Sequence, residues 1–411
     1  MKKIITVILL FKIFTMITAG CSKESEIVIP QSRAGTSSSG SVESSAQNLM
    51  KNIVPNEINF IEYADDFTME NVNSTDFAVR LLQSCMQEGE NTLISPLSVL
   101  CALAMTANGA EGETLTQMEE VLGMSIDALN VYIYKYIQTL PESEKCKLSI
   151  SDSIWFNEGC NFDVNEHFLQ TNADFYGAEI YSAKFDEKTC DDINQWVSDN
   201  TNGMINKILD YISESAIMYL VNALAFDAEW NAIYNENQIR NDVFTCEDGT
   251  EIDTEFMYCG ENRYLEDDDA TGFIKYYSGC SYAFAALLPN EGVTVSEYVL
   301  SLTGEHLADI LADSKDCSVL TSIPKFETAF DIEMSEALVE MGMPLAFNEY
   351  YADFDGIGTV EGKNICINRV IHKTYISIDE KGTEAGAATV VEMNECGAVI
   401  DVTPPKEVYL D

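Results

Sequence analysis

Basic residues are scarce in this chain. Only 23 lysines and arginines stand against 68 aspartates and glutamates in 411 residues, which gives a formal net charge of −45. Such a charge repels nucleic acids and anionic lipid surfaces, because both carry dense negative charge of their own. We therefore expect no nucleic acid and no bare membrane surface as a partner, and the acidity most simply serves solubility.

Histidines and the motifs of common catalytic sites are equally scarce. The chain has three histidines, and it lacks Gly-x-Ser-x-Gly, His-Glu-x-x-His and a phosphate-binding loop. A hydrolase built from Ser, His and Asp far apart in the chain would leave no motif, but nothing supports one. The sequence predicts a protein that is not an enzyme and binds no cofactor.

Metal-binding patterns are missing as well. None of the 12 cysteines forms a Cys-x-x-Cys, and the acidic run from Glu266 to Asp269 lacks the alternating spacing of a calcium loop. Most cysteines, such as Cys101 and Cys366, lie in apolar segments and are expected to be small core residues. We predict no metal site and assign no disulfide.

The first 21 residues have the character of a signal peptide. A basic start, MKK, precedes the apolar run IITVILLFKIFTMITAG and then Cys21. The ending Ala-Gly-Cys resembles a bacterial lipobox, which makes Cys21 the expected lipid attachment site. A plain signal peptide is the alternative, because Thr18 stands where leucine is usual and Lys12 interrupts the apolar run.

Residues 22–62 are expected to form a Ser-rich flexible tether, since the segment is rich in Ser and Gly and has little to bury. No later segment is apolar enough to span a bilayer. The expected location is extracellular or at the cell surface, with membrane contact only through a lipid anchor.

The remaining residues, 63–411, read as one large domain of α+β class. Helical patterns come first: TDFAVRLLQSCMQ, the Ser-Pro-initiated SPLSVLCALAMTANGA, and GETLTQMEEVLG, which ends at a glycine. Strand patterns follow: MYLVNALAFDAEW, YAFAALLP, SVLTSIPKFETAFDI and VIHKTYISID, with the helix MSEALVEMGM among them. Helices first and strands later are typical of an α+β fold.

One late segment, GTEAGAATVVEMNEC (382–396), has the period of a strand although it is poor in large apolar residues. Alternate residues from 383 to 393 are small or uncharged, namely Thr, Ala, Ala, Thr, Val and Met. The two glutamates between residues 383 and 393, Glu384 and Glu392, fall in the other phase. This alternation predicts a strand half-buried in a sheet.

Five segments, in order, resemble the serpins over nearly everything from about residue 63 onward. They are NTLISPLSVLCALAMTANGAEGETLTQM, INQWVSDNTNGMINKIL, LVNALAFDAEW, the pair IPKF and GMPLAFNEYYADFDGI, and VIHKTYISIDEKGTEAGAATV. The resemblance implies a serpin fold: helices packed on a large mixed sheet A, smaller sheets B and C, and an exposed reactive-centre loop. It also implies a monomer that inhibits a serine-type endopeptidase.

In serpins the strand-like segment is the reactive-centre loop, which inserts into sheet A after the protease cuts its bait bond and so traps the protease covalently. The resemblance assigns the hinge to Gly382, Thr383, Glu384, Ala385, Gly386, Ala387, Ala388 and Thr389.

Counting along the loop as in the family places the bait bond between Cys396 and Gly397, with Glu395 or Met393 as alternatives before the bond. Cysteine at this position suits an elastase-like or subtilisin-like target, and a papain-like cysteine protease is a further option. A non-inhibitory serpin that acts as a surface binding or carrier protein is the competing hypothesis. Such proteins tend to carry bulky or charged hinge residues.

Two further groups of residues carry over from the family. Ser95, Ser98, Asn222 and His372 correspond to the sheet-opening region, where the four polar groups are expected to bond to one another. Trp230, Lys325 and Glu380 correspond to the top of the sheet, where insertion begins and where Lys325 and Glu380 are expected to pair.

The sequence departs from the family pattern at its printed end, PPKEVYLD. Serpins continue here into two further strands, without which a second sheet would expose unpaired edges and apolar faces. Either the sequence is a piece of a longer protein, which we favour, or the product depends on a missing peptide. The segment from Cys396 to Pro404 is also longer than in many relatives, which leaves the bait bond open by a residue or so.

Overall fold

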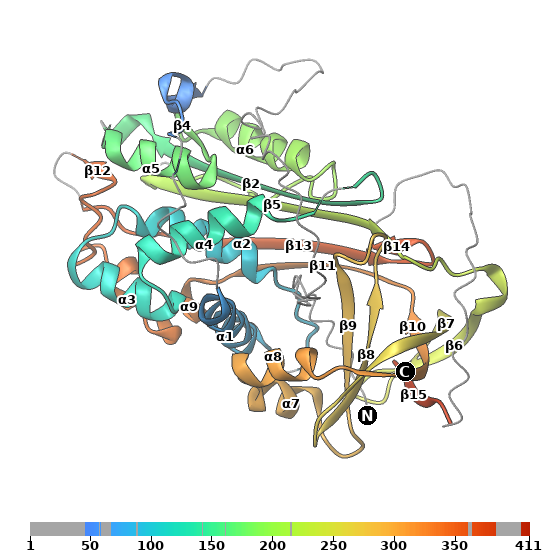
Figure 1. Cartoon of the computed structure of the whole chain (residues 1–411). Coiled ribbons are helices and arrows are strands. Elements are labelled where there is room, and N and C mark those ends of the chain that lie inside the picture. The colour runs from blue at the N-terminus through green and yellow to red at the C-terminus, as the bar shows by residue number, and fades with distance from the viewer. Residues whose placement is uncertain are drawn as a thin grey trace, which may run out of the picture.

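Two large sheets, a separate two-stranded pair and a group of helices make up the described part of the computed structural model (Figure 1). The structure describes residues 46–56, 58, 67–87, 89–141, 143–160, 162–213, 216–360, 364–383 and 404–411. Within these residues no helix is both long and apolar enough to cross a membrane.

The larger sheet, sheet A, has seven strands in the order β1-β4-β2-β5-β14-β13-β11. β2 and β4 run parallel, whereas the other neighbouring pairs are antiparallel, so the sheet is mixed. The strands are β1 (Gln47–Asn48), β2 (Cys146–Asn157), β4 (Glu179–Ala183), β5 (Met218–Glu229), β11 (Phe326–Glu333), β13 (Ile371–Ile378) and β14 (Gly382–Thr383).

The second sheet has six strands, in the order β15-β10-β7-β8-β9 with β6 also paired to β7. Its central strand, β7 (Glu251–Glu266), pairs first with β6 and β10 and then with β8, so the two expected smaller sheets are continuous through it. The others are β6 (Ile239–Thr245), β8 (Ala270–Tyr276), β9 (Ala283–Pro289), β10 (Lys315–Pro324) and β15 (Lys406–Tyr409). β3 (Asp163–Val164) and β12 (Gly358–Thr359) form a separate pair.

Helices cover sheet A on both faces. The helices of the described residues are α1 (Thr68–Cys85), α2 (Pro96–Ala107), α3 (Gly112–Leu122), α4 (Ile126–Gln138), α5 (Glu166–Tyr176), α6 (Glu187–Asn200), α7 (Val295–Ser301), α8 (Gly304–Ala312) and α9 (Ser335–Met341). Of these, α7 and α8 pack against α1 and the second sheet. Short 3-10 helices in the described segments are η1 (Leu49–Asn52), η3 (Glu158–Cys160), η4 (Glu236–Gln238) and η5 (Pro344–Phe347).

Helix boundaries follow the sequence signals. α2 begins at Pro96, where proline fits because the first turn needs no backbone donor. α3 ends at Gly123, whose φ of 77° lies in the left-handed region that glycine adopts without a steric cost.

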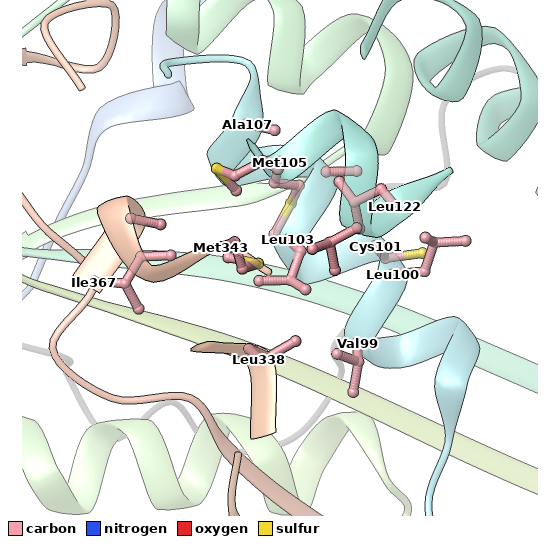
Figure 2. Close-up of a cluster of buried hydrophobic side chains, with 14 of the residues drawn as sticks. Val99, Leu100, Cys101, Leu103, Met105, Ala107, Leu122, Leu338, Met343 and Ile367 are labelled. Atoms are coloured by element: carbon pink, nitrogen blue, oxygen red, sulfur yellow. The ribbon is translucent and has the colours of Figure 1, made fainter. Parts of the chain in front are cut away.

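The helical core is centred on α2. Figure 2 shows Val99, Leu100 and Leu103 of this helix packed among side chains from other parts of the chain, including Leu122, Leu338, Met343 and Ile367. An almost wholly apolar helix predicts burial on most sides, and the structure confirms it.

Alternation along β2 assigns the two faces of sheet A to different helices. Ile154 and Phe156 join the cluster around α2, whereas Trp155 joins the cluster under α6. Successive residues of a strand point to opposite faces, so a single strand serves both layers.

These features confirm the predicted α+β class and the layout of a large mixed sheet with smaller sheets beside it. The extent of the predicted tether, residues 22–62, needs a correction. Residues 46–56 instead contact the folded domain. Gln47 and Asn48 pair with β4. Asn56 donates hydrogen bonds from its backbone and side chain to the carboxylate of Asp174, at 2.7 and 2.9 Å. Sequence composition missed this because the strand has only two residues.

Candidate functional site

The top of sheet A contains the first two residues of the predicted hinge. Gly382 and Thr383 form β14, which lies between β5 and β13 and pairs antiparallel with both: Gly382 opposite Glu229, and Thr383 opposite Ala228 and Ile378. Because β14 is antiparallel to each neighbour, β5 and β13 run in the same direction (Figure 1).

Gly382 has no room for a side chain. A Cβ atom at this position would collide with the carbonyl group of Ala228 on β5. The glycine therefore lets the chain approach β5 closely enough to form the ladder.

The loop that leads into β14 is held by backbone carbonyls. Trp230 donates its backbone N–H to Lys381 O at 2.7 Å and its indole N–H to Asp379 O at 2.9 Å, and Tyr234 N donates to Glu380 O at 3.0 Å. Trp230, which the sequence places at the top of the sheet, is 1% exposed and acts as a donor from both its ring and its backbone.

Lys325 pairs with two carboxylates at this end of the sheet. Its Nζ lies 2.8 Å from Glu380 and 2.9 Å from Glu255 of β7. Partial burial lowers the pKa of Lys325, but hydrogen bonds to Glu380 and Glu255 outweigh this and raise it above its usual value. The bond from Lys325 lowers the pKa of Glu380. The structure therefore brings the expected pair together and adds Glu255 as a third member.

Thr383 is buried and meets the second sheet. Its side chain is 4% exposed, and its hydroxyl lies 2.5 Å from the hydroxyl of Tyr277. Tyr277 stacks on Trp230, with ring centroids 4.5 Å apart and ring planes 9° from parallel. Tyr277 therefore connects Thr383 to Trp230, the residue whose N–H groups bond to the loop before β14. Sequence analysis missed it, because a tyrosine beside a strand end has no distinguishing pattern.

The predicted sheet-opening residues form two groups and not one. Ser95 N donates to His372 Nε2 at 3.0 Å, and the hydroxyls of Ser95 and Ser98 lie 2.9 Å apart. Asn222 instead donates its side-chain N–H to Asp152 at 2.6 Å. The expectation that all four would bond together is therefore wrong for Asn222.

Strand pairing explains this correction. Asp152 lies directly opposite Asn222 on the paired strands β2 and β5, whereas β5 and β13 are not direct neighbours in the described part of sheet A. Asp152 shares the strand phase of the buried residues Ile154 and Phe156. A carboxylate in an apolar phase was a signal that could have identified it.

The two groups have opposite ionisation properties. Burial lowers the pKa of His372 to about 4, so the ring is neutral, and the bond to Nε2 places its proton on Nδ1. Burial raises the pKa of Asp152 to about 6, although the bond from Asn222 opposes that rise.

The remaining predicted site residues lie outside the described residues. These are Cys21, Glu384, Ala385, Gly386, Ala387, Ala388, Thr389, Met393, Glu395, Cys396 and Gly397. Within the described part of the chain, no group of three or more His, Cys, Asp or Glu side chains is arranged to hold a metal ion.

Comparison with known proteins supports a single family. The family model "Serpin (serine protease inhibitor)" matches residues 72–411. The crystal structure of the thermophilic serpin Tengpin in its native state has a TM-score of 0.82 and 44% identity, covering 89% of this chain and 93% of that one.

Two curated proteins extend this similarity. An uncharacterized serpin-like protein of Thermococcus kodakarensis is 30% identical over 324 residues, which is 77% of this chain and 74% of the relative. Human Serpin B9 is 29% identical over 341 residues, which is 78% of this chain and 88% of the relative.

Replacement of Tyr277 by phenylalanine tests the hinge contact. The variant keeps the stacked ring but leaves the buried Thr383 hydroxyl without its partner, at a cost of roughly 1–3 kcal/mol. We expect faster hydrogen exchange at the amides of residues 382 and 383. Tyr282→Phe, which removes a hydroxyl bonded to Pro141 O, is the control. Equal exchange at the hinge in both variants would contradict the contact's role.

Replacement of Asp152 by asparagine tests the opposing ionisations. The folded state binds a proton at Asp152 more tightly than the unfolded chain does, so its contribution to stability falls as pH rises from about 4 to about 6. His372 contributes in the opposite sense, and its contribution is lost as pH falls from 6.5 toward about 4. Asp152→Asn should raise the free energy of unfolding at neutral pH by on the order of 3 kcal/mol.

Urea denaturation across this pH range measures the effect. The variant should lose stability more steeply than the wild type on acidification below pH 6.5, because only the His372 contribution remains. Asp316→Asn, at an exposed position, is the matched control. Parallel pH profiles for Asp152→Asn and the wild type would refute the assignment.

Proposed function

The chain belongs to the serpin family, many of whose members inhibit proteases and are not enzymes, and from this premise we propose that it traps a target endopeptidase by loop insertion. The observation that carries the proposal is the position of β14. Gly382 and Thr383, the start of the predicted hinge, lie in sheet A between two strands that run in the same direction, and the strand-like segment follows them in the sequence.

The part of β5 beyond its pairing with β14 is about as long as the rest of the strand-like segment. β5 has 12 residues, and β14 pairs with only the last two, Ala228 and Glu229. Continuing the same register would bring residues 384–393 opposite residues 227–218. On the other side it would bring residues 384–390 opposite residues 377–371 of β13.

The same register would bring a polar loop residue opposite polar residues of β5 and β13. Thr389 would come opposite both Asn222 and His372, which are polar groups at mid-sheet. The uncharged phase that starts at Thr383 would face inward, as Thr383 itself does, between the buried Ala228 and Ile378. Glu384 and Glu392 belong to the other phase and would stay outward.

Insertion would be strongly favourable. Each added ladder hydrogen bond contributes about 0.5–1.5 kcal/mol net, so about ten inserted residues would contribute on the order of 10 kcal/mol. A gain of that size is comparable to the stability of a whole domain, and it is enough to deform an attached protease.

The mechanism is that of a substrate whose cleavage is never completed. The nucleophile of the protease attacks the carbonyl of the bait residue, Cys396 by the family count, and forms an acyl-enzyme as the peptide bond to Gly397 breaks. Insertion then moves the acylated protease before water can hydrolyse the ester. The proposed targets are elastase-like or subtilisin-like serine proteases, with papain-like cysteine proteases as an alternative.

A second candidate is a non-inhibitory serpin that acts as a surface binding or carrier protein. The small side chains from Ala385 to Ala388 favour inhibition, because bulky or charged residues would resist entry into the sheet. We also propose an extracellular or surface location, with Cys21 as the lipid attachment site, on the basis of the N-terminal sequence.

Incubation of the full-length protein with elastase, subtilisin and papain tests inhibition. We expect an SDS-stable adduct with at least one protease and release of a peptide beginning at Gly397. Thr383→Arg should be cleaved without trapping, because a charged side chain cannot occupy this buried position, whereas Thr383→Ser should still trap. Complete cleavage of the wild type without any adduct would favour the carrier hypothesis.

Glu380→Lys tests the ion pair at the top of the sheet. The substitution places a second ammonium group against Lys325, weakens the anchoring of the hinge and should increase polymer formation several-fold on mild heating, as measured by size-exclusion chromatography. Glu255→Lys also removes a partner of Lys325 but lies on β7, outside the hinge, and is the control. A monomeric and fully inhibitory Glu380→Lys protein would disprove this role.

A further inference from the structure

A lysine lies almost completely buried beneath the top of sheet A. Lys275 of β8 is 2% exposed, and its Nζ lies 2.8 Å from the carboxylate of Glu261 of β7. The ammonium group also lies over the rings of Tyr234 and Trp230, 4.4 and 5.3 Å from their centroids. Burial of an amine is costly, and these contacts compensate for it.

A thiol belongs to the same cluster. Cys259 Sγ lies 3.7 Å from Lys275 Nζ and 3.1 Å from Glu261 Oε1. Cys259 and Glu261 are alternate residues of β7, so their side chains share one face of the strand. Tyr234 and Thr321 place hydroxyl groups 3.4 and 3.3 Å from the sulfur. An amine, a carboxylate and a thiol therefore meet at one point.

The two residues differ in their exposure. Cys259 is half-buried, and Lys275 is enclosed. A small oxidant that enters at the exposed part of Cys259 would meet a sulfur that has the amine beside it. The geometry points to a modification site: on exposure to peroxide, Cys259 and Lys275 form a covalent sulfur–nitrogen crosslink, a sulfenamide.

The reaction balances in two steps. The sulfur of Cys259 attacks one oxygen of hydrogen peroxide, the O–O bond breaks, and a sulfenic acid and one water form. Sulfur is oxidised by two electrons and peroxide is reduced by two. Lys275 then gives a proton to Glu261, and its nitrogen lone pair attacks the sulfur. The S–O bond breaks, and the departing hydroxide takes a second proton from the nitrogen and leaves as water. Glu261 then passes its proton to solvent, which restores the carboxylate.

The role of each neighbour follows from its position. Glu261 accepts hydrogen bonds from both the amine and the thiol, so it is placed to take the proton that frees the nitrogen. Burial raises the pKa of the Cys259 thiol, and the nearby Lys275 charge opposes this. The thiolate is the form that reacts, so the crosslink should form faster at mildly alkaline pH.

The crosslink would join β7 to β8 beside the hinge. Tyr234, whose ring covers Lys275, also donates its backbone N–H to Glu380 O. The modification removes the positive charge that Glu261 and the two aromatic rings share. This inference does not depend on protease inhibition.

Peptide mass spectrometry of the full-length protein tests the crosslink. The protein is treated with hydrogen peroxide, remaining thiols are alkylated, and the chain is digested with trypsin. We expect the peptides that contain Cys259 and Lys275 to be joined with the loss of two hydrogen atoms, and trypsin to fail at Lys275. Fragment ions assign the bond to Cys259 and not to Cys246, which lies on the same peptide. Dithiothreitol should restore both residues.

Two comparisons make the result decisive. Cys280 is exposed and reports the oxidant dose within the same sample. Lys275→Arg keeps a positive charge for Glu261 but removes the primary amine, so no crosslink should form at Cys259. If Cys280 is oxidised while Cys259 is recovered as a free thiol or a sulfinic acid without any joined peptide in the wild type, the proposal is wrong. That readout does not require the variant to fold.

Discussion

The two-residue strand β14 is the contact on which the rest of the site depends. It pairs with both β5 and β13, and because it is antiparallel to each of them, those two strands run in the same direction. Contacts around it hold this short strand in place. The carbonyls of the loop before β14 accept hydrogen bonds from Trp230 and Tyr234, Lys325 pairs with Glu380, and the hydroxyl of Tyr277 bonds to that of Thr383. A short ladder with so many side-chain supports is stable where two backbone pairs alone would not be.

Much of the fold could be predicted from the sequence, because its signals are local. Gly123 ends a helix, Pro96 begins one, and strand periodicity identifies β5 and β13. The family resemblance then assigned residues to the top of the sheet, where Lys325 and Glu380 do meet. What escaped prediction depends on pairing between distant segments. β1 has two residues and no pattern of its own, and the contact between Tyr277 and Thr383 joins two different sheets.

The middle of sheet A shows how strand pairing determines which hydrogen-bond partner a polar side chain finds. Asn222 has a carboxylate directly opposite it on β2, and that neighbour forms the bond expected for His372. His372 finds the backbone of Ser95 instead. Both solutions satisfy polar groups, as the cost of burial requires. Asn222 is bonded within sheet A, whereas His372 is bonded to the residue that precedes α2.

The apolar cluster under α6 sets the condition for any widening between β5 and β13. Its members come from α6, β2, β4 and β5, and Ile371 of β13 packs against it from across the gap. Movement of β13 away from β5 would pull Ile371 from the cluster and expose apolar surface on both sides, unless the incoming chain replaced it. A strand that enters from the β14 end would reach Ile371 last, because Ile371 lies at the other end of β13. The contact of Ile371 with the cluster under α6 would therefore be the last to resist the separation of β5 from β13.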